Sequence, residues 1–203
     1  MRLSGYLASL LLPVAALAQE HTPKNELAFQ LGGFTSTNRG GTSSLRLGSG
    51  MALQSNFARR IVERRSYAIY GEVHFLASPQ RVVSSSDGTA TRDIATLYLT
   101  PGVRVKFAPH SRVSPYLASG AGLAWYEQSR THLNVAPNAA PRELLRGAVG
   151  FGGGVDVGVL RWLALRAEIR DFYTGAPAYN VASVSGGQHN VVVGAAFVIR
   201  WRE

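Results

Sequence analysis

Late in the chain, Arg166, Glu168 and Arg170 stand at alternate positions, separated by single apolar residues. A strand directs every second side chain to the same face, so a strand here would place the three charges side by side. Arginine and glutamate in such a row can form ion pairs, or can pass charge along a pore if they exchange partners. The same spacing elsewhere gives a candidate set on the equivalent faces: Arg46, Glu72, His74, Arg104, Lys106, Arg146, Asp156, Arg166, Glu168 and Arg170.

Two roles are open for this charged set. In the first, the residues form a network of ion pairs that fills the interior of a barrel, because a buried charge without a partner is costly. In the second, Glu72 and Glu168 switch between arginine partners and line a narrow, gated conduction path. Both roles use the same residues, and they differ in whether ions cross the protein.

A third role, acyl-chain hydrolysis at a membrane surface, would need a serine activated by a nearby base. His189 follows Ser183 and Ser185 closely, but these serines lie in a glycine-rich stretch. The spacing His-x-Ser occurs nowhere in the chain. A lipid-modifying enzyme is therefore the lower alternative, and we predict no catalytic residues.

Metal and nucleotide sites are not indicated. The histidines stand apart, at positions 21, 74, 110, 132 and 189, and there is no cysteine. The run Gly150–Gly154 contains four glycines, but strand alternation continues through it and no helix follows. We predict no metal and no cofactor.

The glycines point to a closed barrel. In residues 145–173 one face is apolar, whereas the other carries glycine and charge. Glycine weakens a strand unless something must approach closely, so we expect large charged side chains of the partner strand to fill the vacated space. The apolar face then points outward, toward lipid. The predicted pairs are Arg166 with Gly154, Glu168 with Gly152, Arg170 with Gly150, His74 with Gly48, Glu72 with Gly50, Tyr70 with Ala52, Arg104 with Ala118 and Tyr98 with Ala124.

The same alternation predicts eight strands, at 26–34, 45–55, 67–77, 94–107, 115–127, two within 145–173, and 189–201. Long connections (35–44, 78–92, 128–142, 174–188) alternate with short ones (56–66, 108–114, 158–161). This rhythm is typical of an all-β, eight-stranded antiparallel up-and-down transmembrane β-barrel with four long outer loops and short periplasmic turns. Interfacial aromatic residues are expected at the strand ends: Tyr67, Trp125, Tyr126, Trp162, Phe172, Tyr173 and Trp201.

The N-terminus predicts export. Arg2, the apolar run 7–16 and the Ala16-Leu17-Ala18 cleavage pattern are typical of a signal peptide, so we divide the chain into a signal peptide, 1–18, and a barrel domain, 19–203. The net charge of +9 is carried almost wholly by arginine. Export and the lack of a basic-aromatic cluster argue against nucleic-acid binding.

With these strands and the motif GVDVGVLRWLALRAEIRDFYTG, the chain resembles the bacterial eight-stranded outer-membrane barrels, the group of the OmpA transmembrane domain, OmpX and the opacity-type proteins. The resemblance covers residues 26–201. It implies residence in the outer membrane of a Gram-negative cell. It also implies a C-terminal strand read by the barrel-assembly machinery, here ending at Trp201 before Arg202 and Glu203.

The expected role is structural or interactive, in envelope integrity or adhesion, and the expected state is a monomer. The expected partners are outer-membrane lipids and lipopolysaccharide. Arginines of the long loops suit lipopolysaccharide phosphates: Arg39, Arg81, Arg92, Arg130 and Arg142. Arginines of the first short turn could meet periplasmic headgroups or cell-wall polymer: Arg59, Arg60, Arg64 and Arg65.

Overall fold

The computed structural model describes residues 23–36, 46–84, 90–139, 141–175 and 187–202, and the predicted signal peptide lies outside them. None of the described residues belongs to a helix long and apolar enough to cross a membrane. The strands are β1 (Asn25–Ser36), β2 (Arg46–Leu47), β3 (Gly50–Glu63), β4 (Tyr67–Ser84), β5 (Asp93–Phe107), β6 (Val113–Gln128), β7 (Glu143–Leu160), β8 (Leu163–Gly175) and β9 (Gly187–Trp201).

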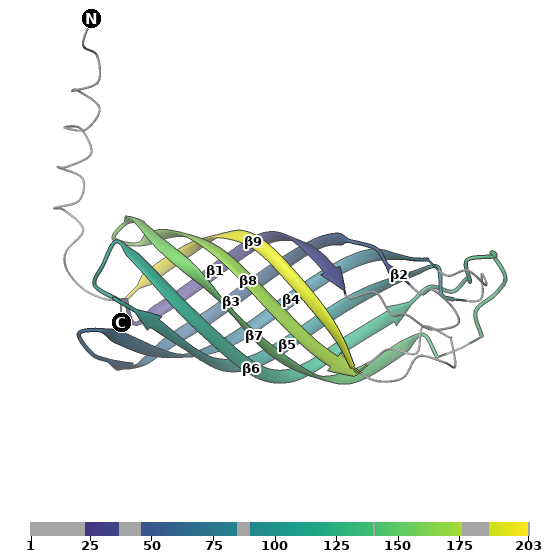
Figure 1. Cartoon of the computed structure of the whole chain (residues 1–203), viewed down its shortest axis with the longest axis horizontal. Coiled ribbons are helices and arrows are strands. Elements are labelled where there is room, and N and C mark those ends of the chain that lie inside the picture. The colour runs from purple at the N-terminus through teal and green to yellow at the C-terminus, as the bar shows by residue number, and fades with distance from the viewer. Residues whose placement is uncertain (1–22, 37–45, 85–89, 140, 176–186, 203) are drawn as a thin grey trace, which may run out of the picture.

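Eight of these strands close into the antiparallel up-and-down barrel that the sequence predicts (Figure 1). Neighbours in sequence pair with each other, and β9 pairs with β1 to complete the ring. The two-residue β2 pairs with β4 and continues the β3–β4 ladder. Closure leaves the barrel wall without an open edge, which is what a sheet needs in order to cross a bilayer.

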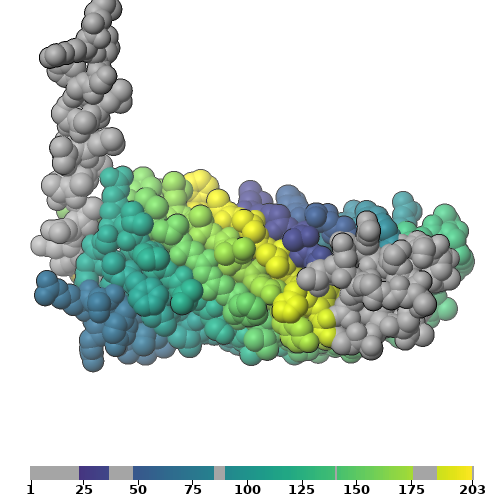
Figure 2. Space-filling view, viewed as in Figure 1, coloured from purple at the N-terminus to yellow at the C-terminus, as the bar shows by residue number. Residues whose placement is uncertain are grey.

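Burial alternates along each strand, as the sequence pattern predicts. In β8, Arg166, Glu168 and Arg170 are buried, whereas Leu165 and Ile169 are about half exposed. The exterior carries large apolar side chains around the ring, and the strands form a continuous outer surface on the face seen in Figure 2. An apolar exterior over a polar interior suits a barrel in lipid.

The connections segregate to the two ends of the barrel (Figure 1). At one end lie the turns β3–β4, β5–β6 and β7–β8, together with the start of β1 and the end of β9, where Asn25 pairs with Trp201. We call this the turn end, and the opposite one the loop end. The predicted long connections belong to the loop end, although 37–45, 85–89 and 176–186 lie outside the described residues.

The first short turn is shorter than predicted. Strand β3 continues to Glu63, so the turn covers 64–66 rather than 56–66. The arginines at 59 and 60 misled the prediction because charge normally ends a membrane strand. Arg59 lies on the exterior at the turn end, where an arginine stem can run along apolar surface with its head in water. The β3–β4 register shifts accordingly, and the strand partners of His74, Glu72 and Tyr70 are not Gly48, Gly50 and Ala52 but Asn56, Ala58 and Arg60.

The second long connection was also misplaced, because β4 extends through Ser84 rather than ending at Ala77. The β4–β5 register shifts between Ser78 and Arg81, so an irregularity interrupts the alternation there. Because the alternation is interrupted there, the sequence pattern predicted a loop for the last part of β4.

Two further hairpin predictions can be compared with the structure. Arg104 pairs with Ala118 and Tyr98 with Ala124, as predicted. In the β7–β8 hairpin the register is displaced by two residues, because β7 runs to Leu160 and the turn lies at 161–162 instead of 158–161. The strand partners of Arg166, Glu168 and Arg170 are therefore Asp156, Gly154 and Gly152.

Candidate functional site

The structure places eight of the ten predicted charged residues inside the barrel, where they are buried: Glu72, His74, Arg104, Lys106, Asp156, Arg166, Glu168 and Arg170. Arg146 is half-buried near the loop end, with Nη1 3.4 Å from the Leu145 carbonyl oxygen. Arg46 belongs to β2, and its side chain lies outside the described part of the structure. The candidate site is thus the lumen itself.

Two carboxylates organise the half of the lumen toward the turn end. Glu26 Oε2 accepts hydrogen bonds from Arg104 Nη1 at 3.0 Å and Arg166 Nη2 at 3.2 Å. Asp156 is held through both oxygens by Arg166, at 2.7 and 3.0 Å. Lys106 bridges the two acids, since its Nζ donates to Glu26 Oε1 and lies 2.7 Å from Asp156 Oδ2. These charges therefore neutralise one another inside the barrel.

Glu72 continues the network toward the middle of the barrel. Its Oε2 accepts from Arg104 Nε at 2.9 Å and Nη2 at 2.7 Å, and its Oε1 accepts from both terminal nitrogens of Arg170 at 3.0 Å. Arg170 also contacts Glu168 Oε2 at 3.3 Å, and the same oxygen accepts from Tyr116 Oη at 2.5 Å. Arg104 bonds to both Glu26 and Glu72, so it connects the two parts of the network.

Tyr116 lies among these charges and occupies the space left by a glycine. Its ring centre is 5.0 Å from the guanidinium carbon of Arg104 and 4.7 Å from that of Arg166. Tyr116 pairs with Gly154 across β6 and β7, and a Cβ at Gly154 would lie 2.6 Å from Tyr116 Oη. The sequence argument expected Arg166 to fill this space from β8. The structure shows that a tyrosine fills it from the strand on the other side.

The half of the lumen toward the loop end is filled mainly by neutral and aromatic groups. Tyr98 and Tyr126 are joined at 3.1 Å through their hydroxyls, and the Tyr126 hydroxyl also lies 2.7 Å from Thr174 Oγ1. The Phe172 ring packs on Tyr98 with centroids 4.9 Å apart. Tyr126 and Phe172 were expected in the interfacial belt; strand alternation instead turns them inward, because their neighbours Trp125 and Tyr173 face outward.

Arg81 is a further correction. It was expected in an outer loop facing lipopolysaccharide, yet it lies in β4 and is only 1% exposed. Its Nη1 donates to Ser36 Oγ at 2.6 Å, and its guanidinium carbon stands 3.9 Å from the centre of the Phe34 ring. Arg81 therefore belongs to the packing of the lumen. Of the other loop arginines, Arg92, Arg130 and Arg142 are exposed, whereas Arg39 lies outside the described residues.

Sequence reasoning missed Glu26 and Arg200 as network members. Glu26 is the first residue of the first predicted strand but was not included in the charged set, although three buried cations contact it. Arg200 contacts Asp156 Oδ2 at 3.2 Å from near the end of β9. The signal for Arg200 was its place between the outward Ile199 and Trp201, which alternation turns inward.

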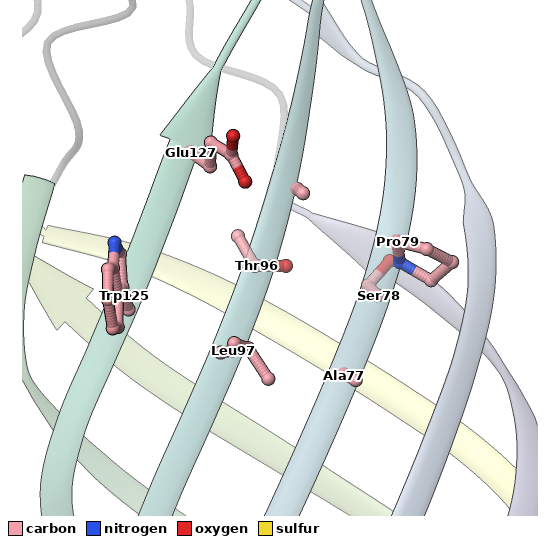
Figure 3. Close-up of a pocket in the computed structure, with 8 residues that line it drawn as sticks. Ala77, Ser78, Pro79, Thr96, Leu97, Trp125 and Glu127 are labelled. Carbon is pink, nitrogen blue, oxygen red and sulfur yellow. The ribbon is translucent and has the colours of Figure 1, made fainter. Parts of the chain in front are cut away.

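A groove of about 350 Å³ opens on the exterior near the loop end, across β4, β5 and β6 (Figure 3). Ala77, Leu97 and Trp125 are strand partners along its lining, and the β4 irregularity at Pro79 borders it. Glu127 lies at the same opening and is paired with Arg142. Most of the residues that line the groove are apolar.

A second exterior feature is a contact between a histidine and a carboxylate, on β9 and β8. His189 Nδ1 lies 2.6 Å from Asp171 Oδ2, and the other carboxylate oxygen, Oδ1, accepts from the Asn190 backbone N–H at 3.1 Å. The His189 ring packs on Tyr173, with centroids 4.9 Å apart. Ser183 and Ser185 lie outside the described residues. The described residues contain no group of three or more acidic, histidine or cysteine side chains that could hold a metal ion.

A closed antiparallel barrel with an apolar exterior and a charged interior defines a transmembrane β-barrel protein. More particularly, the chain has the fold of the eight-stranded outer-membrane barrels. It is similar to the crystal structure of Neisserial surface protein A, with a TM-score of 0.59, 14% identity, and coverage of 90% of this chain and 100% of that one.

Two more distant similarities are to the outer membrane enzyme PagL and to the outer membrane protein OprG from Pseudomonas aeruginosa. PagL matches with a TM-score of 0.49 and 14% identity, covering 86% of this chain and 99% of that one. OprG matches with a TM-score of 0.48 and 11% identity, covering 90% of this chain and 99% of that one. No protein-family model matches the sequence, and neither does any curated protein. At such identities the likeness concerns the fold.

Proposed function

We propose that this protein is a monomeric barrel of the outer membrane with a structural or surface-interaction role, and that its lumen does not conduct ions. The observation that carries the proposal is the filled lumen, in which four carboxylates meet five cations: Glu26, Glu72, Asp156 and Glu168 with Arg104, Lys106, Arg166, Arg170 and Arg200.

The geometry of the ion pairs supports a fixed plug over a gate. Glu72 is engaged by two arginines at once, and each arginine donates to it through two nitrogens. Opening a path would separate these pairs inside the barrel, and breaking a buried pair costs on the order of 3–5 kcal/mol. Eight strands also leave an interior only wide enough for side chains. Function then resides on the outer surfaces, including the exposed Arg92, Arg130 and Arg142, which suit lipopolysaccharide phosphates.

Conductance measurement tests this proposal. The refolded protein in planar bilayers should show no discrete conductance steps, while its gel mobility without boiling differs from that of the boiled protein and so reports an intact barrel. Discrete steps that change in the Glu72→Gln variant would contradict the proposal and favour the gated pore, because that variant weakens the pairing of both Arg104 and Arg170.

Acyl-chain hydrolysis is a second candidate function, and the Asp171–His189 pair is the observation that favours it. A carboxylate that orients a histidine supplies two of the three residues of a Ser-His-Asp triad, in which the histidine activates the serine. The pair is on the outer wall, where lipid is the available substrate.

We expect the main proposal to hold, so the refolded protein should leave phospholipid and lipid A unchanged by mass spectrometry after prolonged incubation. If the wild type releases fatty acid and His189→Ala does not, acyl-chain hydrolysis replaces the structural or surface-interaction role as the proposed function. Asp171→Asn would then reduce the rate through the orientation of His189, and His110→Ala, at the opposite end, is the matched control.

A further inference from the structure

Positive charge is concentrated at the turn end of the barrel. Each short turn and both described ends of the chain contribute at least one lysine or arginine there. We define the cationic rim as Lys24, Arg59, Arg64, Arg65, Arg112, Arg161 and Arg202; all are exposed except Lys24, which is half-buried.

Little negative charge offsets this rim. Among the described residues of the turn end, Glu63 is the single carboxylate outside the lumen. Its Oε2 lies 2.8 Å from Arg60 Nη1, and its Oε1 lies 3.6 Å from His110 Nε2. Arg64 and Arg112 donate to backbone carbonyls, of Glu63 at 3.2 Å and Gly158 at 3.1 Å, which leaves their charge in place. Within the described part of the chain, no carboxylate pairs with a rim residue.

The loop end has a different balance. Outside the lumen, the loop-end arginines whose side chains the structure describes are matched in number by carboxylates, and Arg142 pairs with Glu127. The two sets are Arg92, Arg130, Arg142 and Arg146 against Asp93, Glu127, Glu143 and Asp171. The described part of the lumen holds six cations, Arg81 and Arg200 included, against four carboxylates, so its excess of positive charge is smaller than that of the rim. Within the described residues, the excess positive charge of this chain therefore lies mainly on the rim.

Aromatic side chains place the rim at the depth of lipid headgroups. Trp162 and Trp201 face outward next to Arg161 and Arg202, and the Trp201 and Phe57 rings have centroids 6.3 Å apart. Tyr67 and Phe107, also exposed, extend this aromatic row around the turn end. Such a row marks the boundary between hydrocarbon and headgroups, so the adjoining cations lie at the level of the lipid phosphates.

We propose that the cationic rim binds the headgroups of anionic phospholipids in the leaflet that the short turns face. The proposal rests on the membrane location given above. Arginine is suited to phosphate, because its planar guanidinium donates two parallel hydrogen bonds. The rim is continuous with the aromatic row and the lipid-facing wall, which favours a phospholipid over a soluble polyanion or a cell-wall polymer.

The test uses the refolded full-length barrel domain in nanodiscs that contain phosphatidylethanolamine and phosphatidylglycerol. Native mass spectrometry after partial delipidation counts the lipids that the protein retains. The rim variant Arg59→Gln, Arg64→Gln, Arg65→Gln is compared with a charge-retaining variant of the same positions, Arg59→Lys, Arg64→Lys, Arg65→Lys. All of these side chains are exposed, so both variants should fold with wild-type gel mobility.

Wild type and the charge-retaining variant should retain phosphatidylglycerol preferentially, because lysine keeps the positive charge at each position. The rim variant should lose roughly 10- to 100-fold of that preference, since each of the three cations near an anionic surface contributes up to about a fivefold factor. The preference should also decrease as salt rises. Equal retention by both variants, or no preference in the wild type, would overturn the proposal, and so would sedimentation of the wild type with peptidoglycan in place of lipid enrichment. The conductance measurement tests the filled lumen, whereas lipid retention tests the cationic rim. The two proposals can therefore fail independently of each other.

Discussion

Gly154→Val should lower the free energy of unfolding by at least about 3 kcal/mol, because the new side chain meets Tyr116 and the neighbouring strand at once. A Cβ at Gly154 would lie 2.6 Å from Tyr116 Oη and closer still to the carbonyl oxygen of Ala167. Tyr116 would have to leave Glu168, which is buried and would lose a charge-assisted hydrogen bond of 2.5 Å. Urea titration of the refolded protein in detergent, followed by tryptophan fluorescence, measures the change.

The matched control is Gly147→Val in the same strand. Gly147 faces outward, and a Cβ there would meet no atom within 4 Å, so this variant should fold with nearly wild-type stability. Tyr116→Phe in the Gly154→Val background separates the two causes. Tyr116→Phe should lower the free energy of unfolding much less in this background than in the wild type, because the hydrogen bond from Tyr116 to Glu168 is already lost. If Gly147→Val is the less stable of the two variants, the inside and outside of β7 have been exchanged, and equal stability would contradict the crowding at Gly154.

Glu26→Gln should destabilise the barrel by about 3–5 kcal/mol, because one carboxylate serves several buried cations. Arg104 and Arg166 donate to it at 3.0 and 3.2 Å, and Lys106 is bonded to its other oxygen. The amide removes the negative charge while keeping the shape, and leaves Asp156 to balance this part of the lumen. The midpoint of urea unfolding and the temperature at which the folded gel band disappears should both decrease.

Two comparisons make the Glu26 result specific. Glu63→Gln breaks the ion pair with Arg60. Because the side chains of Arg60 and Glu63 are 19% and 30% exposed, this substitution should lower the free energy of unfolding by less than about 1 kcal/mol. Adding Lys106→Met to Glu26→Gln removes one excess cation and should recover part of the lost stability, which a double-mutant cycle quantifies. If Glu26→Gln costs no more than Glu63→Gln, Glu26 is not the centre of the network.

Local pattern was enough to assign the two faces of the barrel wall. Leu165 and Ile169 face outward while Arg166 and Arg170 face inward, because side chains alternate strictly along an extended strand. The same rule would have assigned Tyr126 and Phe172 correctly had it been applied in place of the expectation that aromatic residues near strand ends belong to the interface. It failed where the strand itself is irregular, between Ser78 and Arg81, because an irregular pairing disturbs the period.

Strand ends and registers were harder to predict. An arginine at a strand end resembles a turn residue, so the prediction ended this strand before Arg59, whereas β3 continues to Glu63. As a result, the predicted partners of Glu72 and His74 were wrong. A register depends on where the turn closes, and a small error in the turn shifts every pair of the hairpin. In β7–β8 that shift placed Arg166 opposite Asp156, where a bidentate ion pair forms.

The sequence alone therefore determined the class of fold, the number of barrel strands and the inward direction of most charges, since each depends on alternation within a single strand. Only the tertiary structure decided which charges meet. Glu26 and Arg166 are 140 residues apart and become partners only when β9 closes on β1. Likewise, the space at Gly154 is filled by Tyr116 of β6, because closure of the barrel brings side chains of several strands to one axis.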